Sequence, residues 1–81
     1  MTPELDISKR HPSTQEKMRW LTPNPNLPAG PPAEVSKDCH LLGLQLIGLL
    51  HDGPQLTIAL QRLVDAKDAA VRQAIADSEV G

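Results

Sequence analysis

Apolar residues recur at helical spacing in the C-terminal part of the chain and predict two long helices. The first is a helix of roughly 18 residues from Ala33 onward, with one apolar stripe at spacings of four and three: Val35, Cys39, Leu42, Leu46 and Leu49. Other aliphatic residues widen this stripe around most of the helix, so we expect it to need cover on more than one side. The second runs from about Pro54 to Asp77, with its own stripe: Leu56, Leu60, Leu63, Ala70 and Ala74. No segment shows the alternation of a strand, and the predicted fold class is all-α.

The segment His51-Asp-Gly-Pro54 separates the two predicted helices. Gly53 suits the left-handed position after a helix, and Pro54 suits the first turn of the next one. So short a connection predicts two antiparallel neighbours, a helical hairpin. Gly43 and Gly48 lower the helix propensity of the first helix, and we expect another backbone to approach closely there.

Prolines divide the chain into an N-terminal arm, residues 1–32, and the helical hairpin, residues 33–81, within a single domain. Seven of the eight prolines lie in the first 32 residues, which excludes a long helix or a central strand there. Ser13-Thr-Gln-Glu16 has the pattern of a capping box, with Ser13 as the N-cap, and predicts a short helix from there to about Leu21. Residues 22–32 are predicted to form an extended, polyproline-like connector.

Composition indicates that this small domain shares its core with other copies. The chain has 81 residues and is 40% hydrophobic, yet it contains one Trp and neither Tyr nor Phe. A single cysteine, Cys39, excludes an intramolecular disulfide, and no Cys/His spacing resembles a zinc site. We therefore predict a homo-oligomeric helical bundle. The net charge of −2 argues against binding of long nucleic acid. No secretory leader or membrane-spanning run is recognisable, so we expect a cytoplasmic protein without a membrane partner.

The sequence favours binding over catalysis. It contains no nucleophile–base signature, phosphate-cradling glycine loop or metal-ligand motif, so we predict no enzymatic activity, no cofactor and no metal. Basic residues gather on the arm, where Arg10 could pair with phosphate, His11 could donate to it and Pro12 stiffens the backbone. Lys17 follows on the short helix. The alternative is an ordinary solvated, charged arm.

Three further residues are candidates for ligand binding. Lys67 falls in the apolar stripe of the second helix, where its ammonium must snorkel, pair with an acid or contact a ligand. Lys37 lies near the start of the first helix, and its alternative is a surface lysine beside Glu34 or Asp38. Trp20 could stack on a base, although we favour a role in anchoring the short helix to the bundle.

Several segments together resemble the hairpin-domain family of phage anti-CBASS and anti-Thoeris proteins. The resemblance covers residues 10–17 and 35–76 and rests on these motifs: His11-Pro-Ser-Thr-Gln-Glu-Lys17, Val35 to Cys39, the turn Leu50-His-Asp-Gly-Pro54, Ala59-Leu60, Leu63 to Ala66, and Ala74-Ile-Ala76. Family members are small α-helical sponges, commonly homohexameric. They sequester cyclic oligonucleotide or cyclic ADP-ribose signals of bacterial immunity in pockets between protomers.

The resemblance implies that this chain binds a cyclic di- or trinucleotide or a cyclic ADP-ribose isomer between subunits, in the cytoplasm of a host bacterium. Lys37 matches by position a family lysine that contacts ligand phosphate. Arg10 stands where family members often carry an aromatic residue that stacks on a base. The predicted ligand-binding residues are Arg10, His11, Pro12, Lys17, Trp20, Lys37 and Lys67. The alternative function is a small helical adaptor that docks a larger protein.

Overall fold

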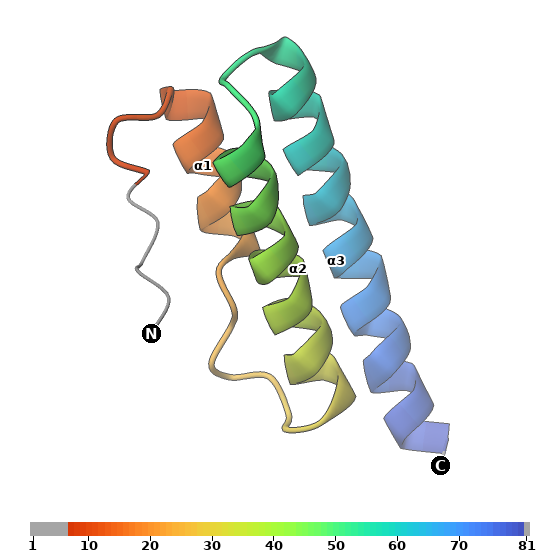
Figure 1. The fold of residues 1–81 in the computed structure, drawn as a ribbon. Helices are drawn as coiled ribbons and strands as arrows, with labels where there is room; N and C mark the ends of the chain where they lie inside the picture. The colour runs from red at the N-terminus through yellow and green to blue at the C-terminus, as the bar shows by residue number, and fades with distance from the viewer. Residues whose placement is uncertain (1–6, 81) are drawn as a thin grey trace.

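The computed structural model describes residues 7–80, which form three α-helices and no strand within that range. They are α1 (Pro12–Leu21), α2 (Pro31–Leu49) and α3 (Pro54–Val80). α2 and α3 lie side by side and run in opposite directions, and α1 packs against both of them (Figure 1). The predicted all-α fold and its antiparallel hairpin are confirmed. No helix in the described range combines the length and the apolar content needed to cross a bilayer.

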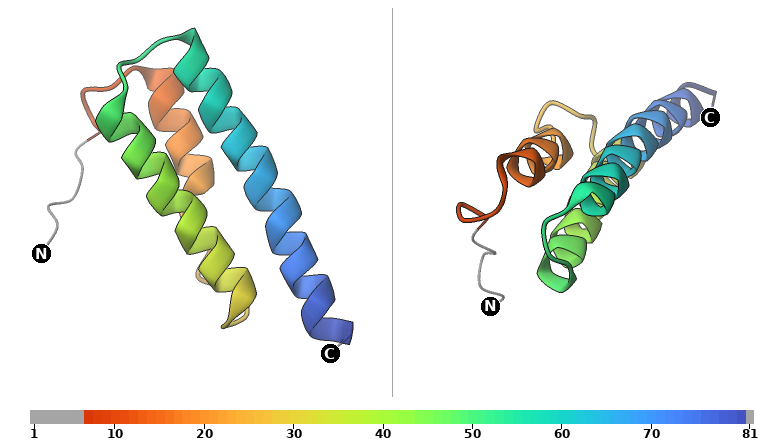
Figure 2. Two further views of the ribbon diagram at one scale, coloured as in Figure 1. Left: turned by 45° about the vertical axis from the view of Figure 1, so that its right-hand side comes forward. Right: turned by 90° about the horizontal axis from the view of Figure 1, so that it is seen from above.

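The core draws on all three helices, so α1 is part of the bundle and not a pendant arm. Met18 and Leu21 of α1 are buried together with Ile47 of α2 and with Leu56 and Leu60 of α3. Seen from above, α1 lies along one side of the hairpin (Figure 2). The predicted hairpin with an extended arm is therefore incomplete, because the short helix supplies side chains that the hairpin needs for its core.

A proline begins each helix, where its missing N–H leaves no hydrogen bond unmade. α1 begins at Pro12, one residue before the predicted start, and its N-cap is His11, whose Nδ1 accepts the Ser13 N–H at 3.1 Å. The predicted capping box with Ser13 as N-cap is therefore wrong. α2 begins at Pro31, so the predicted boundary at residue 32 falls inside its first turn.

The connector between α1 and α2 contains a turn instead of a continuous extended chain. Asn24 Oδ1 accepts the Asn26 N–H at 2.9 Å, and the Asn24 carbonyl accepts the Leu27 N–H at 3.3 Å. An asparagine side chain that bonds two residues ahead closes the backbone locally, which the proline count did not reveal. Gly30 ends the connector with φ of 98°, a conformation that favours glycine.

The buried face of α2 differs from the predicted stripe. Its fully buried positions are Pro32, Ser36, Gly43 and Ile47, whereas Leu42 is 44% exposed and Leu49 is 81% exposed. Since α2 is apolar around most of its circumference, its periodicity could not choose between faces. By contrast, α3 buries Leu56, Leu60 and Ala74 of its predicted stripe, together with Lys67, while Leu63 and Ala70 are half-buried.

The glycine predictions have different outcomes: the one for Gly43 is confirmed in altered form, the one for Gly53 is wrong, and the one for Gly48 finds no neighbour within the protomer. A Cβ on Gly43 would lie 2.8 Å from Leu21 Cδ1, so the close neighbour is a side chain of α1 and not another backbone. A Cβ on Gly48 would meet nothing within 4 Å, so nothing in the protomer requires a glycine there. Among the described residues, Gly30 alone has positive φ, so Gly53 is not left-handed. The chain leaves α2 instead through Leu50 in an extended conformation.

Candidate functional site

Asp52, in the turn between α2 and α3, joins that turn to the start of α1. Its carboxylate accepts the His11 backbone N–H at 2.9 Å, the Thr14 hydroxyl at 2.8 Å and Arg10 Nε at 2.9 Å. The His11 N–H contributes most to lowering the pKa of Asp52 to about 2, with Thr14 and Arg10 adding to it. Asp52 is therefore ionised under all ordinary conditions and fixes α1 against the hairpin.

The Arg10 guanidinium also closes the C-terminal end of α2. Nη1 donates to the Ile47 carbonyl, and Nη2 donates to the Leu50 carbonyl at 2.7 Å. These carbonyls lie at the end of the helix, where backbone acceptors have no partner within the helix and where a cation is favourable. All three guanidinium nitrogens of Arg10 thus donate hydrogen bonds within the protomer. Nε forms the ion pair with Asp52, and Nη1 and Nη2 bind backbone carbonyls.

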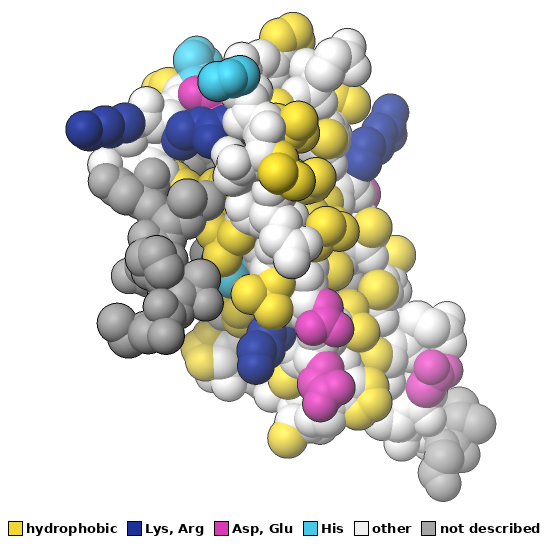
Figure 3. All heavy atoms as spheres, viewed as in Figure 1, with side chains coloured by type: hydrophobic (Ala, Val, Ile, Leu, Met, Phe, Trp, Pro, Cys, Tyr) yellow, Lys and Arg dark blue, Asp and Glu magenta, His cyan; other side chains and the backbone are white. Residues whose placement is uncertain are grey.

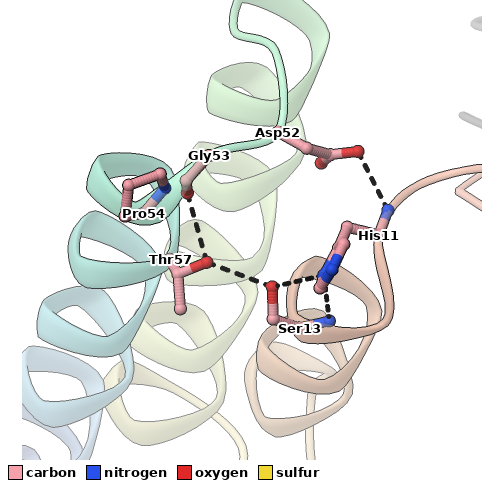
Figure 4. Close-up of a pocket in the computed structure, with 6 residues that line it drawn as sticks. All are labelled: His11, Ser13, Asp52, Gly53, Pro54 and Thr57. Atoms are coloured by element: carbon pink, nitrogen blue, oxygen red, sulfur yellow. Dashed lines mark hydrogen bonds between the residues drawn. The ribbon is translucent and has the colours of Figure 1, made fainter.

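Next to the contacts of Asp52 with Arg10 and His11, polar side chains line an open hollow of about 330 Å³ between the starts of α1 and α3 (Figure 4). The Ser13 hydroxyl lies 2.9 Å from His11 Nδ1 and 3.1 Å from Thr57 Oγ1. Thr57 in turn donates to the Gly53 carbonyl at 3.3 Å. This chain of hydrogen bonds holds the first turn of α1 beside the first turn of α3.

The Ser13–His11 contact is better explained as helix capping than as a catalytic pair. His11 Nδ1 already accepts the backbone N–H of Ser13, so it is occupied at the nitrogen nearest the hydroxyl. A catalytic base also needs a third group that orients the ring, but Asp52 accepts from the His11 backbone and not from the imidazole. The geometry therefore gives His11 a positioning role in this end of the bundle.

Lys67 of α3 binds the end of α1. Its side chain is 9% exposed, and Nζ donates to the Trp20 carbonyl at 2.9 Å and to the Thr22 carbonyl at 3.3 Å. The sequence predicted that a lysine in this stripe needs a partner, and the partner is a pair of helix-terminal carbonyls. Within the protomer, the Lys67 ammonium is directed to α1 and not to an open site.

Trp20 does not anchor α1, contrary to the favoured prediction. Its side chain is 61% exposed, whereas Met18 and Leu21 on the same helix are buried. Leu21 and Met18 anchor the helix instead, and both lie close beside Gly43 of α2. Stacking of Trp20 on a base stays a prediction.

The remaining candidates lie in different places. Pro12 is exposed beside Arg10 and His11, and Lys17 is half-buried on α1. Lys37 is exposed on α2 and makes no hydrogen bond or ion pair within residues 7–80. It precedes Ile47 by ten residues, which corresponds to about 15 Å along the helix from the Arg10 contact. The fold thus brings Arg10, His11 and Pro12 together but leaves Lys37 apart from them.

Sequence reasoning missed the residues that organise this end of the molecule: Thr14, Asp52 and Thr57. Thr14 is fully buried although polar, because its hydroxyl binds Asp52. The only local sign was an aspartate directly before Gly53-Pro54, a pattern equally typical of an ordinary turn. Their pairing joins residues about forty positions apart, which only the packing of α1 on the hairpin reveals.

Comparison with known proteins assigns no relative to this chain: no family model, curated protein or solved structure matches it. The resemblance to the phage hairpin-domain family therefore stays a prediction. Among residues 7–80, His, Cys, Asp and Glu side chains form no group of three or more that could hold a metal ion.

Proposed function

We propose that this protein is a non-catalytic sponge that self-associates and sequesters a cyclic nucleotide signal between its subunits. The ligand class, a cyclic di- or trinucleotide or a cyclic ADP-ribose isomer, comes from the resemblance described above, as does a homohexamer as the assembly. The observation that carries the proposal is the apolar surface of α2. Leu41, Leu42 and Leu49 are 45%, 44% and 81% exposed on a helix that is also buried on its other side.

Exposed leucines on α2 support self-association because burial of such side chains is strongly favourable. Full burial of a leucine side chain contributes about 1.5–3 kcal/mol, and a helix that is apolar all round is typically covered on all sides. Apolar side chains gather over α2 and α3 on the face shown in Figure 3. A chain of 81 residues with a single cysteine has no intramolecular disulfide to stabilise it, and covering that face with further copies would add stability.

The distribution of cations supports a ligand site between subunits. Lys37 is exposed and has no hydrogen-bond or ion-pair partner among residues 7–80, so its ammonium is available to a phosphate. Arg10 has its guanidinium edges bound to Asp52 and to α2, and this leaves the planar faces as the surfaces on which a base could stack. Because about 15 Å of helix separates the two residues within one protomer, one small ligand would meet both only across a subunit boundary.

The test is native mass spectrometry and calorimetry of the full chain with a panel of cyclic di- and trinucleotides and cyclic ADP-ribose isomers. We expect at least one to bind tighter than micromolar and to be recovered intact. Lys37→Ala should weaken binding at least about tenfold, as expected for loss of a charge-assisted hydrogen bond. The matched control Arg62→Ala removes another exposed cation, from α3, and should not. No panel member binding tighter than micromolar, or equal losses in both variants, overturns the proposal.

The alternative proposal is a helical adaptor that docks a larger protein, and the same exposed leucines support it. It predicts a monomer in light scattering and no nucleotide binding. The turn at Asn24 counts against one form of it, in which the connector serves as an extended proline-rich ligand.

A further inference from the structure

We infer that His11 is a proton switch between two sets of hydrogen bonds: the neutral ring caps α1, and the protonated ring links α1 to α3. The groups involved lie at the hollow between the first turns of these two helices (Figure 4). The inference goes beyond the proposed function, because the switch needs no ligand.

A row of three contacts runs from the His11 imidazole to the turn before α3. His11 Nδ1 lies 2.9 Å from Ser13 Oγ. Thr57 Oγ1 lies 3.1 Å from Ser13 Oγ and 3.3 Å from the Gly53 carbonyl oxygen. A carbonyl can only accept, so Thr57 donates its one hydroxyl proton to Gly53, and only the Ser13 hydroxyl proton is left for the other two contacts. While Nδ1 carries no proton, the row is therefore one proton short.

The neutral ring uses Nδ1 for a different bond. Nδ1 accepts the Ser13 backbone N–H at 3.1 Å, which makes His11 the N-cap of α1. A nitrogen that accepts this N–H carries no proton, so the neutral ring holds its proton on Nε2. The cap supplies a partner to one of the backbone donors that the start of a helix leaves without one.

Protonation of the ring must exchange this cap for the row of contacts. Both nitrogens of an imidazolium are donors, so Nδ1 can no longer accept the Ser13 N–H. Nδ1 then donates to Ser13 Oγ and the Ser13 hydroxyl donates to Thr57, so that three protons serve three contacts. Histidine is the side chain whose charge ordinarily changes between about pH 5 and 8, so physiological changes of pH can drive the exchange.

Charges of both signs act on the ring. The Asp52 carboxylate, which accepts the His11 backbone N–H at 2.9 Å, favours the charged ring, whereas Arg10 and the positive end of the α1 dipole oppose it. Lys9 precedes Arg10, His51 precedes Asp52, and both are exposed. The last turn of α2 and the first turn of α3 carry no titratable side chain. Because these charges act in opposite directions, removal of one neutral hydroxyl isolates the contribution of the hydrogen bonds.

Nuclear magnetic resonance of the full chain without nucleotide follows the ring and the cap together. Long-range ¹H–¹⁵N spectra recorded between about pH 8.5 and pH 4.5 report which ring nitrogens carry a proton. At the highest pH we expect the His11 proton on Nε2. As the ring becomes charged, the Ser13 amide proton resonance should move upfield with the same midpoint, because its hydrogen bond is lost. A proton on Nδ1 at the highest pH, or a Ser13 amide that does not follow the ring, overturns the inference.

Thr57→Val removes a hydroxyl that the charged state needs and keeps the shape of the side chain. The midpoint of His11 should fall by at least about 0.3 pH unit, which corresponds to a net contribution of less than one hydrogen bond. Ser13→Ala keeps the backbone N–H, should act in the same direction, and serves as the test if Thr57→Val does not fold. The matched control Thr22→Val removes a hydroxyl that binds the Met18 carbonyl at the other end of α1, and should leave the midpoint within about 0.1 unit. Equal midpoints in the wild type and in the variants of residues 13 and 57 overturn the inference.

Discussion

Replacement of Lys67 by methionine tests whether this buried lysine serves α1 and not a ligand. Lys67→Met keeps an unbranched side chain of similar length but removes both hydrogen bonds to the carbonyls of Trp20 and Thr22. Hydrogen bonds to a charged group contribute about 1.5–3 kcal/mol each, but the substitution also removes the cost of burying an ammonium. We therefore expect a net loss of about 1–3 kcal/mol in the free energy of unfolding.

Urea denaturation followed by circular dichroism measures this loss. For a chain of this length, each kcal/mol lowers Tm by about 4–8 °C, so thermal unfolding should show the change as well. Lys67→Arg keeps cationic donors and should recover part of the stability, whereas Arg62→Met alters an exposed cation of the same helix and should change it by less than about 0.5 kcal/mol. All chains are compared at one concentration, because association shifts apparent stability. A Lys67→Met midpoint equal to or above that of the wild type would refute the capping role.

Two further predictions concern the contacts of α1 with the hairpin. The pKa of Asp52 is lowered to about 2 in the folded chain, against about 3.9 in an unfolded one, so its stabilising contribution should be complete above pH 4 and disappear as the pH falls through 2. The urea midpoints of the wild type and of Asp52→Asn, measured between pH 5 and pH 2, should therefore converge. A constant difference between the two midpoints would contradict the role of the carboxylate. Gly43→Ala should lower the free energy of unfolding by up to about 2 kcal/mol. The new Cβ would lie 2.8 Å from Leu21 Cδ1 and 3.1 Å from Met18 Sδ, and the cost of this overpacking outweighs the gain in helix propensity. A stabilised variant in the same urea assay would show that these side chains move aside freely.

The success of the helix predictions follows from the local nature of their causes. Proline positions and apolar spacing act within a few residues, so α3 and its buried stripe, and the turn before Pro54, were accessible from the sequence. The capping box failed because two local devices competed for the start of α1. Pro12 fits the first helical position, and the imidazole of His11 replaced the Ser13 hydroxyl as the acceptor.

The candidate site was predictable only in its residue types. Lys67 was predicted to snorkel, pair with an acid or contact a ligand, and Arg10 was predicted to bind phosphate or a base, with an ordinary solvated arm as the alternative. The structure supplies backbone carbonyls at helix ends in both cases, together with Asp52 for Arg10. Which carbonyls remain without partners, and which cation reaches them, depends on how the helices pack and not on any spacing in the sequence.

The sequence by itself determined that this protein is helical, where its hairpin turns, and that its core is built almost without aromatic residues, because propensity, proline geometry and composition are properties of the chain. Only the tertiary structure decided which side of α2 is buried. α2 carries apolar residues on nearly all sides, so its sequence left the choice open, and the packing of α1 and α3 settled it, with Leu21 and Met18 of α1 beside Gly43. That choice left Leu41, Leu42 and Leu49 exposed on the opposite side of the helix.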